Sequence, residues 1–192
     1  MTASRNAKRI VRPRIAVLGL GNLMRTDDAV GMLALQRLRA DARFPQTVPL
    51  IEGGTLGLEL IYPLEGFTHL LALDAIDAGV KPGTVLRYSG EAIADLPVSK
   101  SVHLLGFSDL IGSMRLMGNA PGAIVILGVQ PHTIGWGTDL TAPVKAALDL
   151  LADEVIDQVG RWSAGGMDDA AEKTSAAAVV PELSAVQEAW YW

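Results

Sequence analysis

Short apolar runs alternate along the chain with segments in which apolar residues recur every three to four positions. The runs have the length and composition of strands, and the periodic segments have the pattern of helices with one buried face. We expect strands at residues 14–19, 48–52, 69–75, 84–88 and 123–129. We expect helices at residues 28–40, 56–64, 104–117 and 141–161. This order predicts an α/β fold with three α-β-α layers, in which a twisted, mainly parallel five-stranded sheet carries helices on both faces.

Local sequence adds detail to two of these elements. Polar and apolar residues alternate over Thr84–Tyr88, as they do in a strand at the edge of a sheet. Thr55 follows the second strand after Gly53 and Gly54, and its hydroxyl is predicted to cap the helix over 56–64.

The chain divides into three parts by composition. Residues 1–13 form a basic arm that we expect to be flexible, and residues 14–162 form a single α/β domain. Residues 163–192 begin as a linker rich in Ala, Gly, Asp and Glu. They end in an amphipathic segment at 181–192, which either docks as a short helix or stays disordered.

Composition also restricts the chemistry and the partners. The chain has no cysteine, which excludes disulfides, thiolate metal ligands and a cysteine nucleophile. From residue 15 onward there are 11 basic and 21 acidic residues, a balance that disfavours nucleic acid as a partner. No apolar run approaches the roughly 18 residues that span a bilayer, and no signal-peptide core follows the basic arm. We therefore expect a soluble cytoplasmic protein without a membrane partner.

Three residues with metal-binding side chains are predicted to meet at one edge of the sheet. Asp28 lies where the first strand turns into a helix, and Asp74 lies near the end of a strand apolar enough to be buried on both faces. His103 lies where a loop enters a helix. Ligands of open α/β sheets bind beyond the carboxyl ends of the strands, where such junctions gather. A carboxylate buried like Asp74 costs several kcal/mol unless a cation, hydrogen-bond donors or exposure at the strand end compensates it.

Other polar residues fit other roles. Asp27 is predicted to cap the helix after it, which leaves Asp28 free to face the site. His69 begins a strand at the opposite edge of the sheet and is predicted to be a surface residue. His132 follows a strand and is a weaker candidate for a substrate contact.

Two carboxylates and an imidazole would supply three ligands and leave coordination positions open. Oxygen and nitrogen donors suit zinc, nickel or manganese, and the residue types alone do not distinguish among these ions. A Gly-x-Ser-x-Gly nucleophile motif is absent from the sequence. Gly19-Leu-Gly21 is not followed by the third glycine of a dinucleotide-binding turn, because Met24 stands at that position.

With these residues in view, the chain resembles the [NiFe]-hydrogenase maturation endopeptidases. The resemblance covers about residues 14–160 and rests on several short segments in the same order along the chain. They are Gly19–Gly31, Glu52–Leu60, Leu73–Ile76, Pro82–Thr84, His103–Leu110 and Gly128–Pro131.

The resemblance implies a function and a set of site residues. Enzymes of this family remove a C-terminal peptide from the precursor of the hydrogenase large subunit, after nickel has been inserted. The family's metal-contacting acid, strand-end aspartate and histidine fall on Asp28, Asp74 and His103. The resemblance thus implies that these three residues are metal ligands and catalytic residues, with nickel in the precursor, or a divalent ion such as zinc in its place, as the metal.

Two other functions stay open at this point. Gly19-Leu-Gly-Asn22 also resembles peptidyl-tRNA hydrolases, although the histidine expected soon after the motif is missing, since His69 is the first in the chain. A nickel-dependent binding module or chaperone could use the same residues on the same precursor without cutting it. The oligomeric state is not predicted by the sequence.

Overall fold

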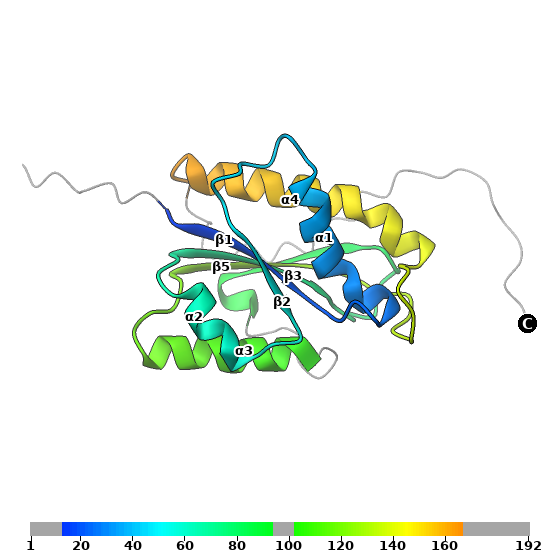
Figure 1. Ribbon diagram of the computed structural model, residues 1–192, viewed down its shortest axis with the longest axis horizontal. Helices are drawn as coiled ribbons and strands as arrows, with labels where there is room; N and C mark the ends of the chain where they lie inside the picture. The colour runs from blue at the N-terminus through cyan, green and yellow to red at the C-terminus, as the bar shows by residue number, and fades with distance from the viewer. Residues whose placement is uncertain (1–12, 94–101, 167–192) are drawn as a thin grey trace, which may run out of the picture.

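The computed structural model describes residues 13–93 and 102–166 (Figure 1). The predictions for residues 1–12 and 167–192 lie outside this part of the chain. Within the described residues, five strands form one sheet in the order β2-β1-β3-β5-β4. Their bounds are β1 Ile15–Leu20, β2 Leu50–Gly54, β3 His69–Ala75, β4 Val85–Ser89 and β5 Ala123–Val129. The strands β2, β1, β3 and β5 are parallel, and β4 runs antiparallel at the edge beside β5, so the predicted fold class is confirmed.

The helices follow the strands in the expected order. The α-helices are α1 Val30–Arg39, α2 Ile61–Leu64, α3 Val102–Leu116 and α4 Ala142–Ser163. Short 3₁₀ turns occur at η1 Thr26–Ala29, η2 Leu58–Leu60 and η3 Gly90–Ile93. The longest of these helices, α4, contains a buried row of apolar side chains at helical spacing, which is the pattern that predicted it.

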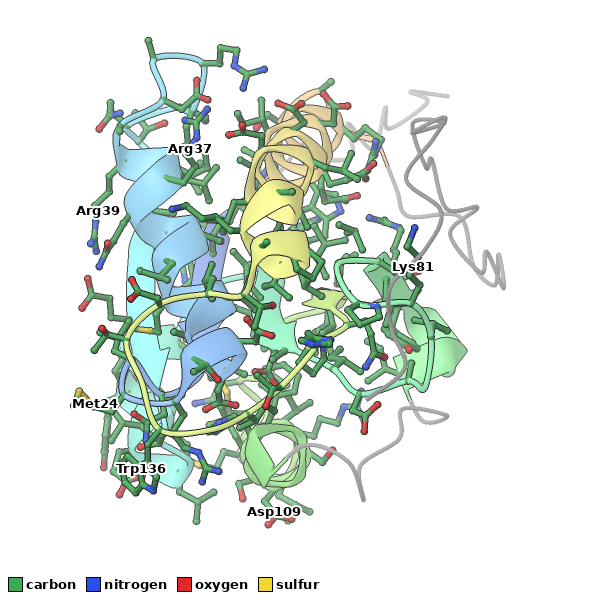
Figure 2. All side chains as sticks on the ribbon, turned by 90° about the vertical axis from the view of Figure 1, so that its right-hand side faces the viewer. Met24, Arg37, Arg39, Lys81, Asp109 and Trp136 are labelled. Carbon is green, nitrogen blue, oxygen red and sulfur yellow. The ribbon has the colours of Figure 1, made fainter. Side chains whose placement is uncertain are left out.

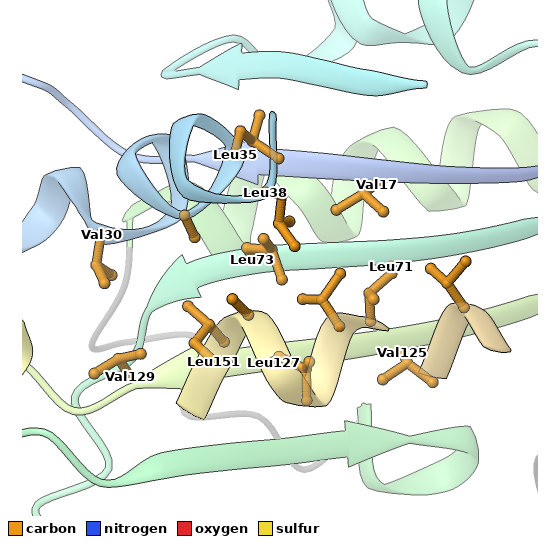
Figure 3. Close-up of a cluster of buried hydrophobic side chains, with 14 of the residues drawn as sticks. Val17, Val30, Leu35, Leu38, Leu71, Leu73, Val125, Leu127, Val129 and Leu151 are labelled. Carbon is orange, nitrogen blue, oxygen red and sulfur yellow. The ribbon is translucent and has the colours of Figure 1, made fainter. Parts of the chain in front are cut away.

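Helices cover both faces of the sheet (Figure 1). α1 and α4 pack on one face, where Leu35 and Leu151 join Leu71 and Leu127 of the sheet in one apolar core (Figure 3). α2 and α3 pack on the other face, where residues such as Phe107 and Leu110 meet the opposite side chains of the same strands. Because alternate residues of a strand point to opposite faces, the central strands contribute to both cores, as their unbroken apolar sequences predicted.

The prediction for the second helix is wrong about where the helix starts and about which residue caps it. Instead of one helix over 56–64 that Thr55 caps, the chain forms η2 and then the four-residue α2. The residue before η2 is Gly57, and no side chain caps the turn from that position. The backbone N–H of Gly57 donates instead to the Glu59 carboxylate, at 3.2 Å, so a local acidic side chain satisfies this end of the turn.

The start of α1 lies unusually close to the ends of β1 and β3. A side chain at Gly31 would collide with the carbonyl oxygens of Leu73 and Leu20. Glycine therefore allows α1 to begin directly against the carboxyl ends of these two strands. This close approach places the segment before α1, which contains Asp28, next to the end of β3, which contains Asp74.

Within residues 13–93 and 102–166, no helix is both long and apolar enough to cross a bilayer.

Candidate functional site

Asp28 is held in a tight turn between β1 and α1. Gly21 adopts a φ of +119°, and a Cβ at this position would collide with the carbonyl oxygen of Asp28. The turn thus needs glycine both for its backbone conformation and for its space. The Asp28 side chain is nearly buried, and its Oδ2 accepts a hydrogen bond from the backbone N–H of Asn22 at 2.8 Å.

Asp28 pairs with His103 across the carboxyl edge of the sheet. His103 is the second residue of α3, and its Nε2 lies 3.1 Å from Oδ2 of Asp28. The two side chains are 9% and 13% exposed, so the pair is largely shielded from water. The fold thereby brings together two residues that are 75 positions apart in the sequence and come from opposite faces of the sheet.

Asp74 is fully buried at the end of β3, opposite Gly128 of β5. Its Oδ1 accepts a hydrogen bond from the backbone N–H of Ala75 at 2.8 Å. Its negative charge acts on His103 strongly enough to contribute to the pKa of that imidazole. The structure therefore gathers Asp28, Asp74 and His103 at one sheet edge, with Asp28 and His103 in direct contact.

The charges of the site favour a carboxylate next to an imidazolium. Burial by itself would raise the pKa of Asp28, but the hydrogen bond and charge of His103, the Asn22 N–H and the charge of Arg25 together lower it. The hydrogen bond to Asp28 raises the pKa of His103 above its ordinary value, against the opposite effect of burial. The charges of Asp74 and Asp28 add to this rise.

As they stand, these side chains do not form a complete metal site. Within residues 13–93 and 102–166, no group of three or more His, Asp and Glu side chains is arranged to hold an ion. Asp28 and His103 point at each other, so an incoming ion would have to replace the proton between them. The donor chemistry fits a divalent ion of the nickel or zinc type, and most of the ion's remaining ligands would have to come from elsewhere.

A comparison with known protein families identifies the family of this chain. The profile of one family, the hydrogenase maturation proteases, matches residues 32–158 of this chain. The chain belongs to the hydrogenase maturation protease family.

Individual relatives agree with this membership. The hydrogenase expression/formation protein HoxM of Cupriavidus necator is 32% identical over 174 residues, which are 88% of this chain and 86% of HoxM. The hydrogenase 2 maturation protease of Escherichia coli is 32% identical over 145 residues, which are 74% of this chain and 88% of that protein.

Solved structures agree as well. The hydrogenase maturating endopeptidase HybD from E. coli superposes with a TM-score of 0.72 and 31% identity, over 77% of this chain and 93% of HybD. Relatives and structural neighbours of this chain are thus endopeptidases of hydrogenase maturation, and this maturation protease is a peptide hydrolase.

One residue of this maturation protease has a different role from the predicted one. Asp27 does not cap a helix, since neither η1 nor α1 has a side-chain cap. Its buried carboxylate binds the loop after β5 instead. It accepts hydrogen bonds from the backbone N–H groups of His132, Thr133 and Thr141, at 2.9, 3.1 and 2.7 Å, and from the hydroxyl of Thr141 at 2.8 Å.

The role of this loop, residues 131–141, was not predicted from the sequence. The loop follows a strand and therefore lies at the same sheet edge as Asp28 and Asp74. This position is the feature of the sequence that could have pointed to a role near the site. The exposed side chain of His132 belongs to this loop, and only its backbone is fixed by Asp27. The predicted substrate contact of His132 stays a prediction.

The prediction for His69 is right about its position at the sheet edge opposite the site, but wrong in treating it as a surface residue. Its ring is half-buried and meets the ring of Trp162 edge-on, with 5.0 Å between the centroids. His69 lies at the start of β3, at the opposite end of that strand from Asp74, so it supports the packing of α4 on the sheet.

An open pocket adjoins Asp28 at the ends of β1 and β2. It encloses about 230 Å³ and is lined by Gly21, Asn22, Leu23, Met32, Gly54 and Thr55. The hydrogen bond from the Gly21 N–H to the Gly54 carbonyl, at 2.9 Å, connects its two sides. Since Asn22 also donates to Asp28, the pocket and the Asp28–His103 pair are neighbours.

Proposed function

We propose that this maturation protease removes a C-terminal peptide from the nickel-loaded precursor of a [NiFe]-hydrogenase large subunit. In this proposal Asp28, Asp74 and His103 form the site that recognises the nickel. The observation that carries it is the direct Asp28–His103 pair at the end of the strand that contains Asp74. We further propose the cytoplasm as the compartment, because a chain without cysteine suits a reducing environment.

The incomplete ligand set supports a metal that arrives with the substrate. Two or three oxygen and nitrogen donors leave coordination positions for ligands of another molecule. Nickel held mainly by thiolates of the precursor could exchange one position for His103 and another for a carboxylate. The ion would then act as the feature that the enzyme recognises in its substrate.

Such binding would also position the reaction. A precursor fixed through its nickel has its C-terminal segment held at one place on the enzyme, which favours reaction at one peptide bond. Precursor without nickel would lack this fixed point, so processing would report that metal insertion is complete. Asp28, Asp74 and His103 are the residues that we assign to catalysis at this position.

The test follows the intact mass of a large-subunit precursor, with and without nickel, after incubation with the enzyme. We expect a C-terminal peptide to be lost from the nickel-loaded precursor alone. Asp74→Asn retains the shape of the side chain and removes its charge, so we expect it to abolish processing without unfolding the protein. A zinc-loaded precursor shows whether the site accepts another divalent ion.

The matched control is Asp109→Asn, which removes an exposed carboxylate from the same helix that carries His103. Normal processing by Asp74→Asn would remove Asp74 from the site. Nickel-dependent binding without any loss of mass would support the binding module instead of the protease.

A further inference from the structure

Exposed apolar side chains gather beside the site on two neighbouring loops. Trp136 is 85% exposed, Met24 is 56% exposed, and Leu23 and Ile134 are each more than one third exposed. Figure 2 shows Trp136 and Met24 near each other, at the end of the molecule away from Arg37 and Arg39. We refer to Leu23, Met24, Ile134 and Trp136 as the Trp136 patch.

Backbone hydrogen bonds hold the two loops of the patch together. The N–H of Gly137 donates to the carbonyl of Met24 at 3.0 Å, and the N–H of Thr26 donates to the carbonyl of Gly137 at 2.8 Å. The Thr26 hydroxyl donates to the carbonyl of Thr133 at 2.9 Å and accepts from the N–H of Gly135 at 3.0 Å. The buried carboxylate of Asp27 binds both ends of the same loop. The patch is therefore formed before any partner arrives.

A cation completes the patch. The guanidinium of Arg25 lies 5.9 Å from the ring centroid of Trp136 and donates a hydrogen bond to the carbonyl of Ile134 at 3.2 Å. A guanidinium has five N–H donors, so the contact with Ile134 leaves capacity for a carboxylate. Arg25 is a cation in a chain whose residues from 15 onward include 11 basic and 21 acidic side chains.

The patch is continuous with the Asp28–His103 pair. The backbone N–H of Asp28 donates to the carbonyl of Arg25 at 2.9 Å. The charge of Arg25 reaches both residues of the pair: it adds to the lowering of the Asp28 pKa, and it opposes part of the rise in the His103 pKa. A macromolecule that reaches the pair with a metal ion would therefore also cover the patch.

We propose that the Trp136 patch is a docking surface for the nickel-loaded precursor, which places an apolar side chain on Trp136 and a carboxylate on Arg25. The proposal rests on the proposed function, because it assigns a second contact to the same substrate. Trp and Arg are the residue types that most often dominate binding energy at protein interfaces. A loop that is already ordered also loses little conformational entropy on binding.

The test measures the affinity of nickel-loaded precursor for the immobilised full-length enzyme. Trp136→Ala should weaken binding by about tenfold or more, since it removes the central aromatic contact. Arg25→Gln should weaken binding at low salt and reduce its dependence on salt, because a charge pair is lost. The matched control is Tyr62→Ala, an aromatic residue of α2 that is 80% exposed. It should leave the affinity unchanged.

Trp136→Ala truncates an exposed side chain and removes only the surface contact with Arg25, so its unfolding temperature should stay close to that of the wild type. Unchanged precursor affinity in Trp136→Ala would overturn the docking surface. So would self-association of the wild-type enzyme that Trp136→Ala abolishes, because the patch would then bind a second copy of the chain. Precursor that binds through Trp136 but is never cut would overturn the proposed protease function and support the docking surface.

Discussion

Two adjacent carboxylates, Asp27 and Asp28, have different roles in this maturation protease. Asp27 is fully buried and accepts four hydrogen bonds from a loop more than 100 residues away. Asp28 accepts hydrogen bonds from Asn22 and His103, and it lies next to the open pocket. One residue thus fixes the surroundings of the site and the next belongs to the site.

Because the two carboxylates differ in role, we expect Asp27→Asn to affect mainly stability and Asp28→Asn to affect mainly activity. Asp27→Asn replaces one acceptor oxygen by an amide group that faces other donors, so we expect the free energy of unfolding to fall by about 2–3 kcal/mol. Asp28→Asn should lower it by about 1 kcal/mol while it abolishes nickel-dependent processing. Urea unfolding and precursor mass measure the two effects. Equal destabilisation by both variants would contradict this division of roles between the two carboxylates.

The turn before Asp28 leads to a second prediction at the level of single residues. Gly21→Ala forces a side chain into a backbone conformation that costs about 1–3 kcal/mol and into contact with the Asp28 carbonyl. The control is Gly112→Ala in α3, where an added Cβ meets no atom of the described residues outside its own stretch of helix within 4 Å, and where alanine favours the helix by about 0.5–1 kcal/mol. Thermal unfolding should show opposite signs for the two variants. A stabilising Gly21→Ala would contradict the strained turn.

The positions of residues at the boundaries of strands and helices were predicted correctly from the sequence, whereas the role of Asp27, whose partners lie in an irregular loop, was not. Asp74 and His103 stand at a strand end and a helix start, and these boundaries are visible as changes in apolar pattern. The partners of Asp27 lie in the irregular loop 131–141, which has no periodicity to locate it. An acid before a helix fits a cap equally well, so only the structure distinguishes the two roles of Asp27.

Among the elements, those with long apolar patterns match their predicted bounds best. β3 and β5 begin and end at the predicted residues, and α4 begins one residue later and ends two residues later than predicted. The second helix failed because its four α-helical residues are too few for a periodic pattern, and because Glu59 rather than Thr55 satisfies its first turn. Burial on a face is thus predictable from the sequence, whereas the local geometry of a short turn is not.

A cluster of charges ties α1 to α4 and predicts a pH dependence of stability. Asp41 follows α1 and accepts hydrogen bonds from Arg43 and Arg37, which also pair with Asp153 and Asp149 of α4. The hydrogen bonds from Arg43, with the charges of both guanidinium groups, hold the pKa of Asp41 well below its ordinary value.

A carboxyl whose pKa is lowered by folding stabilises the protein above its unfolded pKa, and this contribution is lost as the pH falls further. The urea midpoint of the wild type should therefore exceed that of Asp41→Asn at neutral pH. The difference should shrink as the pH falls below about 4, where Asp41 begins to be protonated in the unfolded chain. A difference that is constant across this range would show that the charge of Asp41 contributes nothing.

At the scale of the whole molecule, the site joins the two helical layers through the sheet. Asp28 comes from the layer that contains α1, His103 comes from α3 in the opposite layer, and Asp74 lies in the strand between them. The distance between Asp28 and His103 therefore depends on how both layers pack. The cores on the two faces share the same strands, but His103 belongs to α3, so its position depends most directly on the core on that face.

This arrangement predicts that two core cavities of similar cost affect processing differently. Phe107→Ala in α3, one helical turn after His103, and Leu151→Ala in α4 should each lower the free energy of unfolding by about 3–5 kcal/mol, because both side chains are buried in a core. Phe107→Ala lets α3 shift against the sheet and so displaces His103 from Asp28, whereas Leu151→Ala leaves both in place.

Nickel-dependent processing, measured at a temperature at which both variants are folded, should fall by about tenfold or more for Phe107→Ala and stay near the wild-type rate for Leu151→Ala. Equal losses in the two variants would mean that general loosening of the fold, rather than the position of α3, sets the activity.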